Sequence, residues 1–149
     1  MKRFIFLLWL VLLFLLSGCS NERKYELRQT LDSIQTIELL YVSPYDSYAN
    51  KQFLKMEAIT SVDKKNWEDL VNRIGNTSCK EYFHDPSWSI SKSVFRITYQ
   101  DESVELICAK GGLYYSENDW KYRYLYFDKD EFQSIVDDFT HSTCRTGDG

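Results

Sequence analysis

Side chains that could perform acid–base or nucleophilic chemistry are scarce in this chain. The 149 residues include two histidines, His84 and His141. Asp85 follows His84, and a histidine with a carboxylate is two thirds of a Ser-His-Asp nucleophile system. Adjacent side chains rarely face each other, however, and no serine stands in a G-x-S-x-G elbow. We therefore expect no catalytic residues, and we expect His84-Asp85-Pro86 to form a turn.

The thiol of Cys19 is the group whose surroundings point most clearly to a reaction. Residues 4–16 are 13 consecutive apolar residues, and Lys2 and Arg3 precede them. A positive start, an apolar run of this length and small residues before a cysteine are typical of an export signal. The run is shorter than the roughly 20 residues that cross a bilayer, which disfavours an uncleaved membrane-spanning helix.

The residues Leu16-Ser17-Gly18-Cys19 resemble the lipobox of bacterial lipoproteins. In that family the cysteine receives a diacylglycerol on its sulfur and becomes the mature N-terminus. The resemblance implies a signal peptide at residues 1–18 and a lipid anchor on Cys19. Two acyl chains hold a protein firmly at a membrane. The domain would then lie outside the cytoplasm, at the cell membrane or the outer membrane; in a host with two membranes, Ser20 implies outward sorting. The resemblance covers only the leader.

Composition limits the classes of partner. Without residues 1–18 the chain has 131 residues, with 16 Lys and Arg against 22 Asp and Glu, a net charge of −6. This charge argues against a nucleic-acid partner. The length fits one domain. We predict an anchor and stalk at 19–33, a single α+β domain at 34–140 and a flexible tail at 141–149.

Three cysteines remain besides the proposed anchor: Cys79, Cys108 and Cys144. Their spacing matches no compact metal-binding pattern, so we predict neither a metal site nor a cofactor. Thiols outside the cytoplasm tend to oxidise. The pairing stays open: a disulfide between Cys108 and Cys144 is the preferred hypothesis, and three reduced, buried cysteines are the alternative.

The hydrophobic pattern predicts an open antiparallel sheet of about six strands with two helices packed on one face. Period-2 alternation and β-branched or aromatic content indicate strands at 36–43, 53–60, 80–83, 93–100, 103–115 with a break at the glycine pair, and 120–127. Apolar residues at i, i+3, i+4 and i+7 indicate two helices, with the stripes Trp67, Leu70, Val71 and Ile74, and Phe132, Ile135, Val136 and Phe139. Asp63 and Asp128 should cap the starts of these helices, and Gly75 should end the first.

The predicted strand at 120–127 contains the most informative aromatic row. Trp120, Tyr122, Tyr124 and Tyr126 alternate along it and would share one face. If this face packs against the helices, the row belongs to the core and its phenols need buried partners. If it faces solvent, the four rings form a surface of the kind that binds partners.

These observations favour a lipid-anchored binding module. We expect it to recognise a protein or envelope component through the uncovered sheet face and its aromatic row. A structural or assembly accessory of an envelope complex is the alternative. The shortage of catalytic groups makes an enzyme the weakest of the three hypotheses.

Overall fold

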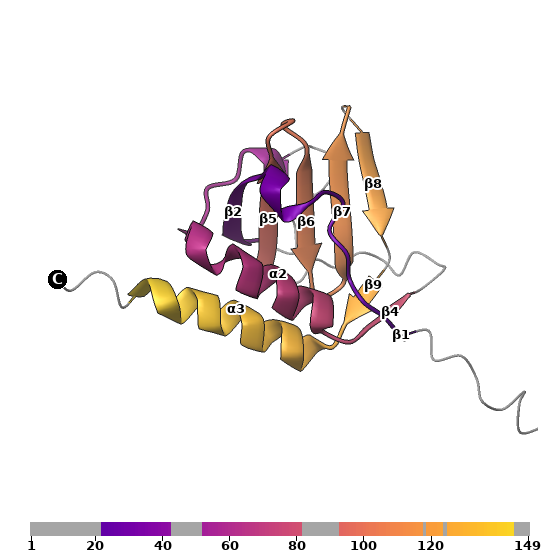
Figure 1. Cartoon of the computed structure of the whole chain (residues 1–149), viewed down its shortest axis with the longest axis vertical. Helices are drawn as coiled ribbons and strands as arrows, with labels where there is room; N and C mark the ends of the chain where they lie inside the picture. Colours follow the sequence, from indigo (N-terminus) through magenta and orange to yellow (C-terminus); the bar gives the residue numbers. More distant parts are fainter. Residues whose placement is uncertain (1–21, 43–51, 82–92, 118, 124, 145–149) are drawn as a thin grey trace, which may run out of the picture.

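The computed structural model describes residues 22–42, 52–81, 93–117, 119–123 and 125–144, which form an α+β fold (Figure 1). A six-stranded antiparallel sheet lies at its centre, with the spatial order β3-β2-β5-β6-β7-β8. The expected open antiparallel sheet of about six strands is confirmed. Its strands, in chain order, are Ile34–Tyr41 (β2), Thr60–Ser61 (β3), Ser93–Tyr99 (β5), Val104–Cys108 (β6), Gly111–Ser116 (β7) and Asp119–Arg123 (β8).

A second, smaller sheet forms beside the first. It contains β1 (Glu22–Arg23), β4 (Cys79–Glu81) and β9 (Leu125–Phe127), all antiparallel. The amide of Phe127 donates a hydrogen bond of 3.0 Å to the carbonyl of Ala109, between β6 and β7. The small sheet therefore adjoins that end of the large one.

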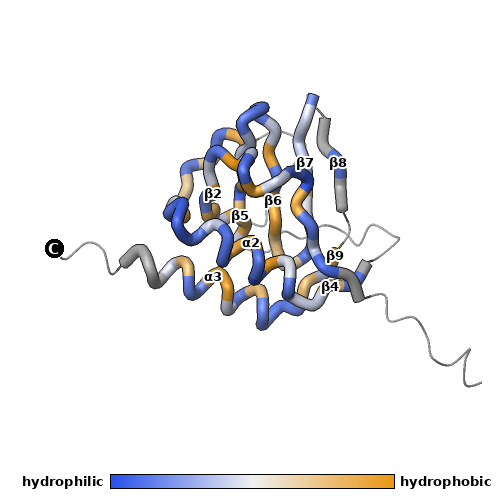
Figure 2. Tube along the Cα trace, viewed as in Figure 1, coloured by the Kyte–Doolittle hydropathy of each residue, from blue (hydrophilic) through white to orange (hydrophobic). Residues whose placement is uncertain are grey.

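Two described α-helices, α2 (Trp67–Asn76) and α3 (Lys129–Cys144), pack on one face of the six-stranded sheet, as predicted. Hydrophobic positions recur among hydrophilic ones along both helices (Figure 2). The buried positions follow the predicted spacing, and they are Trp67, Leu70 and Ile74 in α2 and Phe132, Ile135, Val136 and Phe139 in α3. None of the helices in the described ranges is long and apolar enough to cross a bilayer.

The two helices begin differently, although an aspartate precedes each. The carboxylate of Asp128 accepts the backbone N–H groups of Asp130 and Glu131, both at 3.0 Å, so the predicted cap of α3 is confirmed. Before α2, a 3-10 turn (η4, Lys64–Asn66) intervenes, and Asp63 makes no side-chain cap hydrogen bond. Gly75 lies inside α2 rather than after it, so both predicted ends of this helix are wrong.

The sheet face opposite the helices has a core of its own. Leu40, Val94, Leu106 and Leu113 are each at most 1% exposed there. A segment at 52–58, which begins with the 3-10 turn η3 (Gln52–Leu54), packs on this face through apolar side chains. The expected uncovered sheet face is therefore wrong at its centre, and β6 is buried along its whole length.

Three predicted strands differ from the observed ones. Residues 53–60 are mostly irregular because they cover the second core, and only their last residue belongs to β3. Residues 103–115 form two strands, β6 and β7, with a turn at 109–110. Residues 120–127 divide into β8 and β9, which belong to different sheets because β9 pairs with β4.

Candidate functional site

Residues 24–33, called the strap below, connect β1 to β2 across the helix-covered side of the sheet (Figure 1). Tyr25 is 4% exposed, and Leu27 and Leu31 pack against the core. The strap ends in the 3-10 turn η1 (Leu31–Ser33). The expectation of a stalk is wrong for these residues, because they are packed into the domain.

A buried carboxylate fixes the strap to the sheet. Glu105 of β6 is 1% exposed. Its Oε1 accepts a hydrogen bond of 2.5 Å from the Tyr25 hydroxyl. Its Oε2 accepts the Tyr99 hydroxyl at 2.5 Å and the backbone N–H of Arg28 at 3.0 Å. Three donors thus stabilise one carboxylate, and two of them belong to the strap.

Gly112 makes room for this contact. A Cβ built on Gly112 would overlap the Tyr25 hydroxyl and lie 3.1 Å from two carbons of its ring. The Tyr25 ring therefore lies directly over the backbone of β7. Close approach of a ring to a strand is a structural reason for glycine at such a position.

The surroundings of Glu105 keep its neighbouring phenol neutral. Burial, followed by the charge of Glu105 and the hydrogen bond to it, raises the pKa of Tyr99 far above its ordinary value. A phenol in this state donates a hydrogen bond but does not act as a base near neutral pH. The cluster is therefore built to hold the strap, and its carboxylate already accepts three hydrogen bonds.

A second polar cluster fixes the far end of the strap. The side-chain amide of Gln29 donates to Asp101 Oδ2 and to Ser103 Oγ, both at 2.8 Å. The Ser103 hydroxyl donates to Asp101 Oδ1 at 2.6 Å, and the Tyr114 hydroxyl donates to Ser103 Oγ at 3.1 Å. Hydrogen bonds from the side chain and backbone of Ser103, and then from Gln29, hold the pKa of Asp101 below its usual range.

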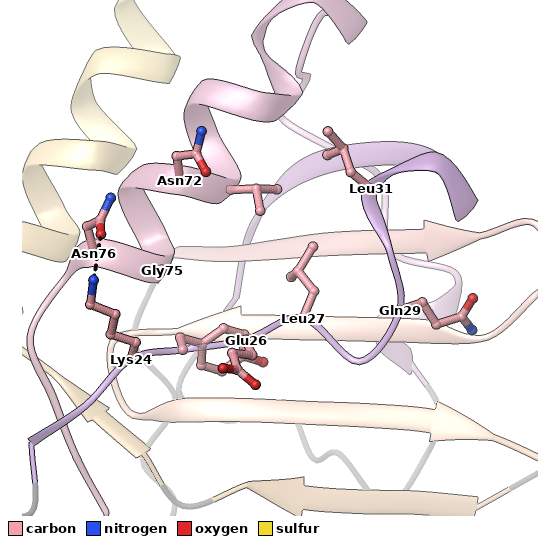
Figure 3. Close-up of a pocket in the computed structure, with 10 residues that line it drawn as sticks. Lys24, Glu26, Leu27, Gln29, Leu31, Asn72, Gly75 and Asn76 are labelled. Atoms are coloured by element: carbon pink, nitrogen blue, oxygen red, sulfur yellow. Dashed lines mark hydrogen bonds between the residues drawn. The ribbon is translucent and has the colours of Figure 1, made fainter.

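A groove of about 370 Å³ runs between the strap and α2 (Figure 3). Leu27 and Leu31 line it from the strap, and Asn72 and Asn76 line it from the helix. The Lys24 ammonium donates a hydrogen bond of 3.3 Å to the side-chain carbonyl of Asn76. The groove is thus a seam between two packed segments, with apolar and amide groups along it.

On the other side of the sheet, Arg96 holds the segment at 52–58. Its side chain is 9% exposed and contacts Glu38 Oε2 through Nε at 2.9 Å and Nη2 at 2.8 Å. Its Nη1 donates to the carbonyls of Phe53 at 2.7 Å and Met56 at 2.9 Å. A single guanidinium therefore connects the sheet to the covering segment.

The structure divides the three described residues of the predicted aromatic row between two strands. Trp120 and Tyr122 belong to β8, where they lie opposite Tyr115 and Leu113 of β7. Tyr126 is half-buried in β9, opposite Lys80 of β4. Tyr124 lies outside the described residues, as do Cys19 and the His84-Asp85 pair.

The cysteines occupy opposite sides of the large sheet. Cys79 is a buried thiol in the core beneath the helices, and Cys108 is a buried thiol on the other face. Cys144 is the last residue of α3, which covers the helix side. The side chain of Cys144 is not among those described, so the Cys108–Cys144 disulfide stays a prediction.

Sequence reasoning missed the groups that hold the strap and the covering segment. Glu105 carried a signal: it is a carboxylate within the apolar run Val104-Glu105-Leu106-Ile107-Cys108. A charged residue in a buried strand needs hydrogen-bonding partners. The pattern predicts only a break in the strand at the glycine pair, whereas Gly112 lies within β7 and faces a ring from a distant segment. The sequence around Arg96 gives no comparable indication of its carbonyl partners.

No protein-family model matches the chain, and neither the curated proteins nor the solved structures contain a match.

Proposed function

We propose that this chain is a membrane-anchored lipoprotein whose extracytoplasmic domain is a binding module for a protein or another envelope component. The lipobox-like residues ending at Cys19 support the anchor. The observation that carries the proposal is the attachment of the strap through Glu105, because it joins the domain firmly to the segment that leads to Cys19. Confinement at a membrane raises the effective concentration of partners there, so a weak interface suffices.

The edge strand β8 is the surface that we assign to the partner. Among the described strands, β8 has one neighbour, β7. An edge strand offers backbone donors and acceptors to another chain. Its residues Trp120 and Tyr122 are of the types most enriched at the energetic centres of interfaces. Tyr126 belongs to the other sheet, so the proposed surface centres on Trp120 and Tyr122.

Affinity capture of the full-length protein from host membranes tests this function. Trp120→Ala and Tyr122→Ala should each reduce recovery of a bound partner by about tenfold or more, the loss expected for an interface hot spot. Tyr41→Ala is the matched control. Tyr41 is a 54% exposed tyrosine of β2, which lies near the opposite edge of the large sheet from β8.

All three variants should have the same urea midpoint of unfolding as the wild type. Unchanged recovery by the folded β8 variants would reject β8 as the binding surface. If the partner co-purifies with this protein at a fixed stoichiometry through every step, the result would instead favour an assembly accessory of an envelope complex.

A further inference from the structure

We propose that the end of the molecule formed by β1, β4 and β9 rests on the phospholipid head groups, with the Lys80 and Lys129 ammonium groups directed at the lipid phosphates. This inference deepens the proposed function and rests on acylation of Cys19. It identifies which surface the anchored domain turns toward the bilayer and which surface remains for a partner.

The first argument is the length of the connection. Glu22, the first residue of β1, is three residues after Cys19. A chain spans at most about 3.3–3.6 Å per residue, so the two Cα atoms lie within about 11 Å of each other. Glu22 pairs with Lys80 of β4, and β4 pairs with β9. The small sheet is therefore the described part of the domain nearest to the proposed acyl chains.

The second argument is the chemistry of this end. Lys80 and Lys129 are exposed, and each lies in or within two residues of a strand of the small sheet. Long lysine side chains can extend their ammonium groups to an interface. Anionic lipids attract each such charge within a Debye length.

Carboxylates also occur here, and the two that accept backbone N–H groups keep their negative charge. Asp128 accepts the N–H groups of Asp130 and Glu131 at the start of α3. Glu131 accepts the N–H of Ser78 at 3.3 Å. Asp130 is exposed, and the side chains of Glu22 and Glu81 are not described. The orientation therefore rests on the short connection and on the exposed positions of the lysines, and not on the net charge of this end.

The third argument comes from the opposite end of the large sheet. Its turns carry exposed carboxylates: Asp101 and Glu102 lie between β5 and β6, and Glu117 follows β7. Asp32 is nearby, because its carbonyl accepts the side-chain amide of Gln100 at 3.2 Å. An anionic bilayer repels these groups. In the orientation that the short connection favours, these carboxylates lie at the end away from the bilayer.

Lysine footprinting tests the orientation on the full-length, membrane-extracted protein. The protein is reconstituted in vesicles of phosphatidylethanolamine and phosphatidylglycerol, treated with a membrane-impermeant acetylating reagent, and compared with the same protein in detergent. Acetylation of Lys80 and Lys129 should fall about fivefold in vesicles, as expected for ammonium groups held at anionic head groups. Lys64 and Lys65, which lie just before α2, should keep their reactivity.

A charge-reversal pair sharpens the test. Lys80→Glu should restore part of the reactivity of Lys129 in vesicles, whereas Lys65→Glu should not. Sedimentation with the vesicles is measured in parallel. Protein that sediments but shows equal reactivity at all lysines would overturn the orientation and leave the anchor intact. Protein that does not sediment would overturn the anchor, and the orientation with it.

Discussion

At the scale of single residues, Glu105 is the group on which the position of the strap depends. Its carboxylate accepts hydrogen bonds from Tyr25, Tyr99 and the Arg28 backbone. A buried carboxylate with several donors is stable, whereas a buried donor that loses its acceptor costs free energy. The same residue also explains why the strap follows one path across the sheet, since its two oxygens receive groups from both ends of the segment Tyr25 to Arg28.

Replacing this carboxylate by an amide should separate the effect of charge from that of shape. In Glu105→Gln one oxygen becomes an NH₂ group, which faces at least one of the donors. The free energy of unfolding should fall by about 2–3 kcal/mol, the loss of a charged hydrogen bond plus an unsatisfied donor. Urea unfolding at neutral pH measures it. Glu102→Gln, on an exposed turn, is the control and should change stability by less than about 0.5 kcal/mol. Equal effects of the two variants would show that Glu105 does not hold the strap.

Gly112 offers an independent test of the same contact. Gly112→Ala should destabilise the domain by about 1–3 kcal/mol, as overpacking commonly does, because the new methyl group overlaps the Tyr25 hydroxyl. In a Tyr25→Phe background the cost should be smaller, since the hydroxyl is absent. A double-mutant cycle by urea unfolding gives the coupling energy. Additive effects would contradict direct contact between the two residues.

At the scale of elements, the sequence predicted apolar faces better than it predicted boundaries. Spacing identified the buried residues of both helices, since a helix stripe depends only on local periodicity. It did not show that residues 120–127 divide between two sheets, because β9 is defined by its pairing with the distant β4. The path of 52–58 likewise depends on Arg96, which lies about 40 residues further along the chain.

The starts of the two helices predict different stabilising roles for Asp63 and Asp128, whereas the sequence alone predicts the same role for both. Asp63 and Asp128 occupy equivalent places before similar apolar stripes, but the Asp128 side chain accepts helix N–H groups and that of Asp63 does not. Asp128→Ala should therefore cost about 1 kcal/mol of unfolding free energy, the usual value of an N-cap.

The matched variant, Asp63→Ala, should cost only a few tenths of a kcal/mol, because it removes one exposed ion pair with Lys65. Both values come from urea unfolding of the two variants beside the wild type. A larger loss for Asp63→Ala than for Asp128→Ala would mean that the starts of the helices are assigned incorrectly.

At the scale of the whole molecule, the packing of the strap changes what a lipid anchor on Cys19 would mean for the position of the domain. Sequence analysis predicted a stalk up to residue 33, whereas the domain already includes β1 at Glu22. The many charged residues of this segment favoured a stalk. Its packing depends on Tyr25, on Leu27 and on Glu105, which lies 80 positions from Tyr25. An anchor on Cys19 would therefore hold the domain against the bilayer with one end turned toward it. That arrangement would turn the acidic turns at 101–102 and 117 away from the bilayer.

The most direct test of this account is the mass of the N-terminal tryptic peptide of the full-length protein purified from host membranes. Cleavage after Arg23 should release a peptide of residues 19–23 that begins at Cys19 and carries a diacylglycerol on its sulfur. A membrane-derived protein that begins at Met1, or that has an unmodified thiol at Cys19, would contradict the anchor and the orientation inferred from it.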